Sequence, residues 1–86
     1  MTHLLDARKQ THGDFVEQFR ISQELKEIIR DYQFNTLSDV HKEALEMILM
    51  KISRIVAGDA HHADHWQDIA GYAMRSVEWM NQFNDK

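Results

Sequence analysis

Helix-breaking residues are scarce in this chain of 86 residues, which contains no proline and only three glycines. The glycines stand at positions 13, 58 and 71, so long stretches of sequence run without any breaker. Proline removes a backbone donor and glycine raises the entropy cost of ordering the chain, which is why helices often end at these residues. No segment shows the two-residue alternation of a half-buried strand. The sequence therefore predicts a few long helices and an all-α fold.

The first helix is expected to begin near Asp14, whose carboxylate can cap it, and to run to about Tyr32. Apolar and small residues recur at helical spacing through this stretch. A linker over residues 33–37 follows, and either Thr36 or Ser38 can cap the second helix. The sequence thus predicts one helix before the linker and two longer helices after it.

The second helix is expected to run to Ala57 and to be ended by Gly58 in a left-handed conformation. Asp59 then caps a third helix that extends to about Phe83. Residues 1–12 are expected to form a loosely held arm or a short extra turn. The predicted fold is a single all-α domain over the whole chain, with three main helices in an antiparallel bundle that dimerisation completes.

The composition excludes several classes of protein. Because the chain has no cysteine, neither disulfides nor thiolate metal sites can stabilise it, and a reducing cytoplasm is the expected location. No apolar run approaches the roughly 18–20 residues of a membrane span, and no signal-peptide pattern is visible. The formal net charge is −4, with acids and bases well mixed, so a basic patch for nucleic acid is not expected. We therefore expect a cytoplasmic protein without a membrane or nucleic acid partner.

The second expected helix is amphipathic on two sides when successive residues are placed about 100° apart. Its broad apolar side consists of Leu45, Ile48, Leu49, Ile52, Ile55 and Val56. The opposite side consists of Glu43, Glu46, Met47, Met50 and Arg54. Methionine commonly fills adaptable packing surfaces, so this charged side is also expected to be contacted.

The third expected helix repeats the pattern. The side predicted to face the core consists of Trp66, Ile69, Ala70, Ala73, Val77 and Met80. The other side consists of Asp64, Asp68, Tyr72, Arg75 and Trp79. Gly71 and the neighbouring alanines leave little bulk, which favours the close approach of another helix. Two-sided helices predict a homo-oligomer whose second sides bury each other, while a monomeric bundle with a mixed surface explains the same pattern.

Four carboxylates are spaced to share helix sides: Glu43 with Glu46, and Asp64 with Asp68. If the two pairs converge across antiparallel helices, their oxygens are the hard ligands that Mg²⁺ or Mn²⁺ prefers. The alternative is that these acids are surface charges paired with nearby lysines and arginines. The spacing predicts a candidate magnesium site and leaves both interpretations open.

Cations and aromatic rings accompany these acids. Lys51, Arg54 or Arg75 could bind a substrate phosphate beside the metal. Trp79 together with Tyr72 could stack on a base or on a side chain of a partner. Packing inside an oligomer is the other interpretation of these two rings.

Histidines cluster just before the third helix. His61 and His65 are one helical turn apart beside Asp64, so a site for Zn²⁺ or Ni²⁺ is geometrically possible. This spacing is common by chance, and the glutamate of a His-Glu-x-x-His motif is missing. Alternatively, His61 and His62 lie in the capping turn, where the helix dipole disfavours their charged form. No nucleophile paired with a base and no phosphate-binding glycine loop identifies a catalytic residue.

Two segments resemble a known group of proteins. Residues 44–55 include Lys-Ile-Ser-Arg-Ile, and residues 64–73 include Asp-Ile-Ala-Gly-Tyr-Ala. Both look like small phage and prophage proteins of unassigned function, which are in turn similar to the MazG-like all-α nucleotide pyrophosphohydrolases. The likeness covers about residues 12–80.

The resemblance implies a helical bundle completed by dimerisation or a higher oligomer. In active MazG-like enzymes, a Glu-Glu-x-x-Glu helix and a Glu-x-x-Asp helix bind Mg²⁺ and split a nucleoside triphosphate into monophosphate and pyrophosphate. Glu43 and Glu46 match the first motif, and Asp68 matches the end of the second. Lys42 replaces the first glutamate of the doublet, and His65 stands where the second motif has its glutamate. Asp64 is the one residue that could substitute there.

Two functions from different classes follow. The differences from the MazG-like motifs at Lys42 and His65 favour an interaction or regulatory module with a degenerate acidic site. Its charged and aromatic surface would bind a host protein or another copy of the chain. The alternative is a Mg²⁺-dependent nucleoside triphosphate pyrophosphohydrolase in which the metal activates the attacking water. Only the second function requires the four carboxylates to converge.

Overall fold

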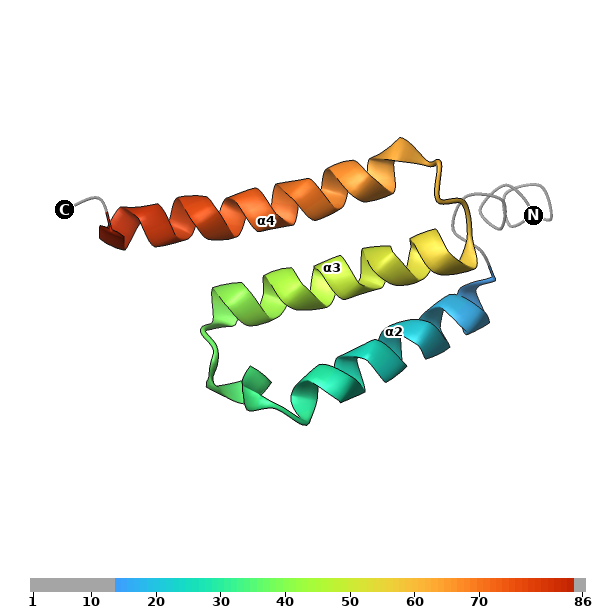
Figure 1. Cartoon of the computed structure of the whole chain (residues 1–86), viewed down its shortest axis with the longest axis horizontal. Helices are drawn as coiled ribbons and strands as arrows, with labels where there is room; N and C mark the ends of the chain where they lie inside the picture. Colours follow the sequence, from blue (N-terminus) through green and yellow to red (C-terminus); the bar gives the residue numbers. More distant parts are fainter. Residues whose placement is uncertain (1–13, 85–86) are drawn as a thin grey trace.

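The computed structural model describes residues 14–84, which fold into three α-helices and one turn of 3-10 helix (Figure 1). In chain order these are α2 (Phe15–Arg30), η1 (Gln33–Thr36), α3 (Asp39–Ala57) and α4 (Ala63–Asn84). No strand occurs in this range. The predicted all-α class and the antiparallel three-helix architecture are confirmed. The expectation for residues 1–12 lies outside the described residues.

The middle of the molecule is α3, and the other two helices pack against it from opposite sides (Figure 1). Each helix runs antiparallel to the one before it. α2 and α4 make no comparable contact with each other. The three helices therefore lie side by side in one open layer. No helix in this described part is long and apolar enough to cross a membrane.

Side chains cap the first two helices as local sequence rules predict. Asp14 Oδ1 accepts a hydrogen bond of 2.9 Å from the Val16 N–H at the start of α2. Ser38, rather than Thr36, caps α3, because its hydroxyl accepts at 3.1 Å from the backbone N–H three residues on. Thr36 donates to a backbone carbonyl of η1 at 2.6 Å. The predicted linker over residues 33–37 thus contains a short helical turn of its own.

The turn between α3 and α4 differs from the prediction at two residues. Gly58 follows the end of α3 and its N–H donates to the Arg54 carbonyl at 2.9 Å, but its φ of −123° is not left-handed. The predicted left-handed cap is therefore wrong. Asp59 accepts at 2.9 Å from the N–H of His61, which stabilises the turn, and α4 begins only at Ala63. The predicted capping role of Asp59 is also wrong, because its carboxylate is used before the helix starts.

Few apolar side chains are fully buried among the described residues, although many on the helices are half-buried. Phe34 of η1, at 8% exposure, is the one large apolar side chain there that is buried. The other buried side chains are Gln18, Ser22, Ser53 and His65. Trp66 was predicted to lie in the core, and its exposure of 54% shows that this prediction is wrong.

The open layer explains this exposure physically. A helix in the middle of a layer contacts its neighbours along two opposite edges, and the two remaining sides stay uncovered. The apolar side of α3 points to one of these open sides, so Leu45 is 40% exposed and Val56 is 67% exposed. Helical periodicity predicted correctly which residues share a side, but no helix within residues 14–84 covers that side.

Candidate functional site

Two hollows lie between α3 and α4, and the helical register places them on opposite sides of the layer. The first, of about 380 Å³, is lined by Leu37, His41, Ala44, Leu45, Ile48, Ala73, Ser76, Val77 and Met80. The second, of about 360 Å³, is lined by Asp39, Val40, Glu43, Ala44, Tyr72, Arg75 and Ser76. Ala44 and Ser76 line both because they lie at the contact between the helices. Residues two positions apart on a helix point about 200° apart, which separates Leu45 from Glu43 and Val77 from Arg75.

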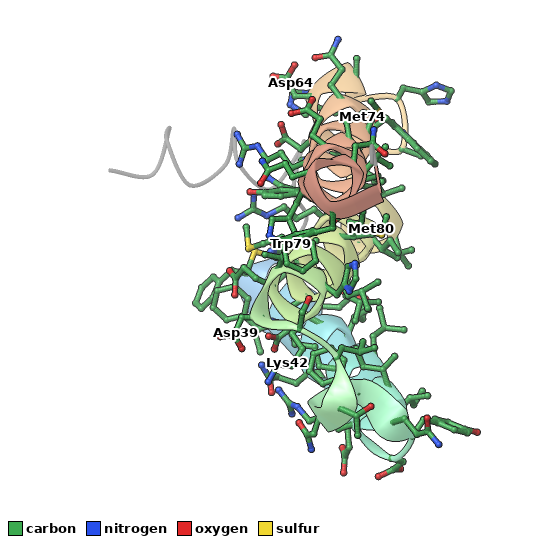
Figure 2. All side chains as sticks on the ribbon, turned by 90° about the vertical axis from the view of Figure 1, so that its left-hand side faces the viewer. Asp39, Lys42, Asp64, Met74, Trp79 and Met80 are labelled. Carbon is green, nitrogen blue, oxygen red and sulfur yellow. The ribbon has the colours of Figure 1, made fainter. Side chains whose placement is uncertain are left out.

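We call the side of the first hollow the apolar face. By helical register it continues along α3 to Ile52 and Val56, and along α4 to Ala70 and Trp66. We call the side of the second hollow the mixed face. Figure 2 looks along the helices, with Met80 on the apolar face at the right and Asp64 on the mixed face at the left. The two broad sides of the layer therefore differ in chemistry, and the predicted site residues point mainly to the mixed one.

The four carboxylates predicted to hold a metal are not brought together as one set, although Glu43 and Glu46 both line a hollow between α3 and the end of α2. Glu46 turns toward α2, where its Oε2 lies 3.8 Å from a guanidinium nitrogen of Arg30. Asp68 faces α3, and Asp64 is 75% exposed, with its Oδ2 3.8 Å from Nε2 of the His62 ring. Within residues 14–84, no group of three or more histidine or acidic side chains is placed to hold a metal ion.

The helix register explains this separation. Lys51 and Asp68 lie level with each other across the antiparallel pair of α3 and α4. Eight residues before Lys51 on α3 and eight residues after Asp68 on α4, Glu43 and Ser76 lie at the same level. This position agrees with the structure, in which both residues line the second hollow. Asp64 is then about 18 Å from that level along the helix axis, at 1.5 Å per residue. Neither side chain can cross this distance.

Lys51 and Asp68 form a close ion pair between α3 and α4. The distance from Lys51 Nζ to Asp68 Oδ2 is 2.9 Å, and the lysine side chain is only 12% exposed. The hydrogen bond from Lys51 lowers the pKa of Asp68 below its ordinary value of 3.8, and the charges of Lys51, His65 and Arg54 act in the same direction. Asp68 is therefore held ionised by protein cations. Its ion pair with Lys51 agrees with the alternative interpretation, in which these acids are surface charges paired with nearby lysines and arginines.

The predicted substrate-binding residues divide into two groups on the mixed face. Lys51 and Arg54 lie beside Asp68, towards the end of α3. Tyr72 and Arg75 lie further along α4, where the guanidinium carbon of Arg75 stands 5.6 Å from the centre of the Tyr72 ring. Such a stack orients the guanidinium over the ring. Tyr72 and Arg75 share the second hollow with Glu43 alone among the predicted metal ligands.

The histidines that precede α4 have different surroundings. His61 lies exposed in the connecting turn, whereas His65 is only 2% exposed. The rings of His62 and His65 are 4.7 Å apart. His61 and His62 precede α4, as the alternative interpretation predicted, and the burial of His65 was not predicted.

An aromatic cluster at the far end of α4 was missed in part by sequence reasoning. The Trp79 ring contacts those of His41 and Phe83, with centroids 5.4 Å and 5.1 Å away. Trp79 and Phe83 are four residues apart, a spacing that places them on one side of a helix. No signal in the sequence singled out His41, because its contact depends on how α3 and α4 are aligned. Trp79 thus makes edge-to-face contacts with rings of its own chain, and the prediction that it stacks on a base or a partner together with Tyr72 is not tested by these contacts.

Gly71 does not mark a close approach between helices within the chain. A Cβ atom added at this residue would meet nothing within 4 Å in the described structure. The small residue is therefore not required by packing among residues 14–84, and the prediction of close approach is not confirmed there. Its position on α4 faces away from α3.

The chain belongs to the family described as a domain of unknown function (DUF6378), whose model matches residues 2–79. No curated protein and no solved structure matches the chain.

Proposed function

We propose that this member of the DUF6378 family is an interaction module that functions by covering its apolar face with the helices of a protein partner. The observation that carries the proposal is how few apolar side chains are fully buried: Phe34 is the one large apolar side chain buried among residues 14–84. A domain of this size is marginally stable even when it buries about 60% of its surface. Binding to the folded state adds stability, so a partner on the open face would compensate for the small core. The proposal includes a cytoplasmic location for the protein.

The composition of the apolar face supports an interface. Leu45 and Val77 are each 40% exposed at its centre, and Val56 and Trp66 are 67% and 54% exposed along it. Single exposed apolar residues are common on protein surfaces, but a contiguous patch of several marks an interaction site. We assign a regulatory role to the charged and aromatic residues of the mixed face, as the resemblance to a degenerate MazG-like site suggests.

Cysteine labelling inside cells tests whether the apolar face is covered. Because the chain has no cysteine, a single introduced thiol reports on one position. Val77→Cys on the apolar face should react slowly with a cell-permeant maleimide, whereas the exposed Glu78→Cys next to it should react fast. After purification and dilution, both thiols should react fast. Equal labelling rates in the cell would contradict the proposal.

A second candidate function is favoured by one observation on the mixed face. Glu43, Tyr72 and Arg75 line one hollow of about 360 Å³, within the size range of small-ligand sites. An aromatic ring can stack on a base, and a guanidinium can bind phosphate. This arrangement supports nucleotide binding with Mg²⁺, and pyrophosphohydrolase activity is the corresponding reaction. The dispersed positions of Glu46, Asp64 and Asp68 count against it.

The second candidate is tested by titrating Mg²⁺ or Mn²⁺ with a panel of nucleoside triphosphates. It predicts pyrophosphate release or, for an inactive site, a nucleotide-dependent rise in the melting temperature. Arg75→Ala and Glu43→Gln should reduce either signal, and Glu78→Gln, outside the hollow, should not. If no nucleotide changes the melting temperature and none is cleaved, this candidate is excluded.

A further inference from the structure

We propose that the partner on the apolar face is a second copy of this chain, bound so that the two apolar faces meet and the two mixed faces point outward. This inference rests on the proposed function and names its partner. It differs from the expectation drawn from the sequence, in which the charged second sides of the helices bury each other. Three properties of the face support a second copy: its area, its shape and its charge.

The exposed area is of the size that a small homodimer needs. Side chains such as Leu45, Val56, Trp66 and Val77 present on the order of 100–250 Å² each when fully exposed. At 40–67% exposure, these four leave roughly 350 Å² of apolar surface uncovered. The half-buried Ile48, Ile52 and Met80 of the same face add to this area. The total approaches the roughly 600–800 Å² per partner of a small specific interface.

The shape of the described part favours a matching layer. Helical domains are stable when the apolar stripes of one layer pack on another layer. Here the apolar stripes of α3 and α4 line one hollow and therefore lie on the same side. A second copy, related by a two-fold axis, would supply the same pair of stripes. The result would be two stacked layers with one shared core between them.

The charge pattern selects the apolar face for self-association. In a two-fold interface each residue near the axis meets its own copy, so any charge there meets a like charge. No acidic, lysine or arginine side chain lines the hollow of the apolar face, where His41 is the single titratable group. The hollow on the mixed face is lined by Asp39, Glu43 and Arg75. Two apolar faces can therefore meet without the repulsion that like charges would cause.

Matched substitutions on α3 test which face is used. Leu45→Glu places a charge on the apolar face, and Met47→Glu places the same charge about 200° around the same helix. Light scattering after size-exclusion chromatography should give twice the mass of one chain for the parent protein and for Met47→Glu. Leu45→Glu should give the mass of one chain, with its helical circular dichroism retained. Loss of the dimer in Met47→Glu alone would overturn the proposal.

Crosslinking of single cysteines tests the identity of the partner. Ala73→Cys and Val77→Cys should each crosslink to a differently tagged copy through a short bis-maleimide, while Met47→Cys should not. A chain that stays monomeric while Val77→Cys is protected in cells would exclude the second copy but keep the proposed interaction module. A monomeric chain whose Val77→Cys is labelled freely in cells would exclude both. Crosslinking mainly through Met47→Cys would place the mixed faces together and overturn the proposal.

Discussion

Lys51 Nζ lies 2.9 Å from Asp68 Oδ2, and this ion pair joins the second half of α3 to the first half of α4. It is the shortest ion pair among residues 14–84, where the others measure 3.6–3.8 Å. The lysine is largely withdrawn from solvent, so the attraction is screened less than that of an exposed pair. The contact holds two neighbouring helices in register in a layer where few apolar side chains are fully buried.

Asp68→Asn should destabilise the protein at neutral pH and have no such effect in strong acid. The folded state lowers the pKa of Asp68, mainly through the hydrogen bond from Lys51. The unfolded chain therefore binds a proton more readily, and the pair contributes stability that is present above pH 3.8 and is lost as pH falls below it. Urea unfolding measured from pH 7 to pH 2.5 should show the parent and the variant converging at low pH.

Asp64→Asn is the matched control for this prediction. Asp64 is one helical turn before Asp68, and its side chain is 75% exposed. The same removal of a carboxylate should change the free energy of unfolding by less than about 0.5 kcal/mol, as for most surface substitutions. A pH dependence equal to that of Asp68→Asn would show that general charge, and not the pair with Lys51, causes the effect.

Local signals in the sequence predicted the helices well, because each depends on a few neighbouring residues. Asp14 and Ser38 cap helices where a capping side chain was expected, and α3 ends at the residue before Gly58. The turn before α4 was predicted less well. Asp59 has the chemistry of a helix cap, but its carboxylate stabilises the turn, and the sequence alone does not separate these two roles.

The positions of the site residues were harder to predict. Helical periodicity shows which side of a helix a residue occupies, but it does not show which residues of another helix lie next to it. Trp66 shares a side with Val77, as predicted, but no element of the described part covers that side. The candidate magnesium site required Glu43 and Asp64 to converge, and the alignment of α3 with α4 places Glu43 beside Tyr72 and Arg75 instead. That alignment depends on contacts between residues distant in sequence, such as Lys51 with Asp68.

Ser38→Ala should cost about 1 kcal/mol of stability, since it removes the hydroxyl that accepts from a backbone N–H at the start of α3. Thr36→Ala is the control two residues earlier. The Thr36 hydroxyl donates to a carbonyl within η1 and caps no helix. Urea unfolding at pH 7 should show the larger loss for Ser38→Ala. A larger loss for Thr36→Ala would mean that η1 contributes more to stability than the cap of α3.

Arg30→Met should change the free energy of unfolding by less than about 1 kcal/mol, because its ion pair with Glu46 is 3.8 Å long and the two side chains are 45% and 30% exposed. Lys51→Met should cost more, because it leaves Asp68 without its hydrogen-bonding cation. Unfolding in low and in 0.5 M salt distinguishes the two pairs. Salt should remove most of the change in unfolding free energy caused by Arg30→Met, and a smaller share of the change caused by Lys51→Met.

Gly71→Ala should stabilise the protein by up to about 1 kcal/mol, since glycine is the poorer helix former by that amount. The new methyl group meets nothing within 4 Å in the described structure, so it adds no strain. For a domain of this size, the melting temperature should rise by roughly 4–8 °C per kcal/mol. Gln67→Ala, at an exposed position one turn earlier, should change stability much less, because glutamine already favours the helix.

Gly71 points away from the apolar face, so the mass of the Gly71→Ala variant in solution should equal that of the parent. A destabilised Gly71→Ala variant with reduced mass would instead place a partner against this side of α4.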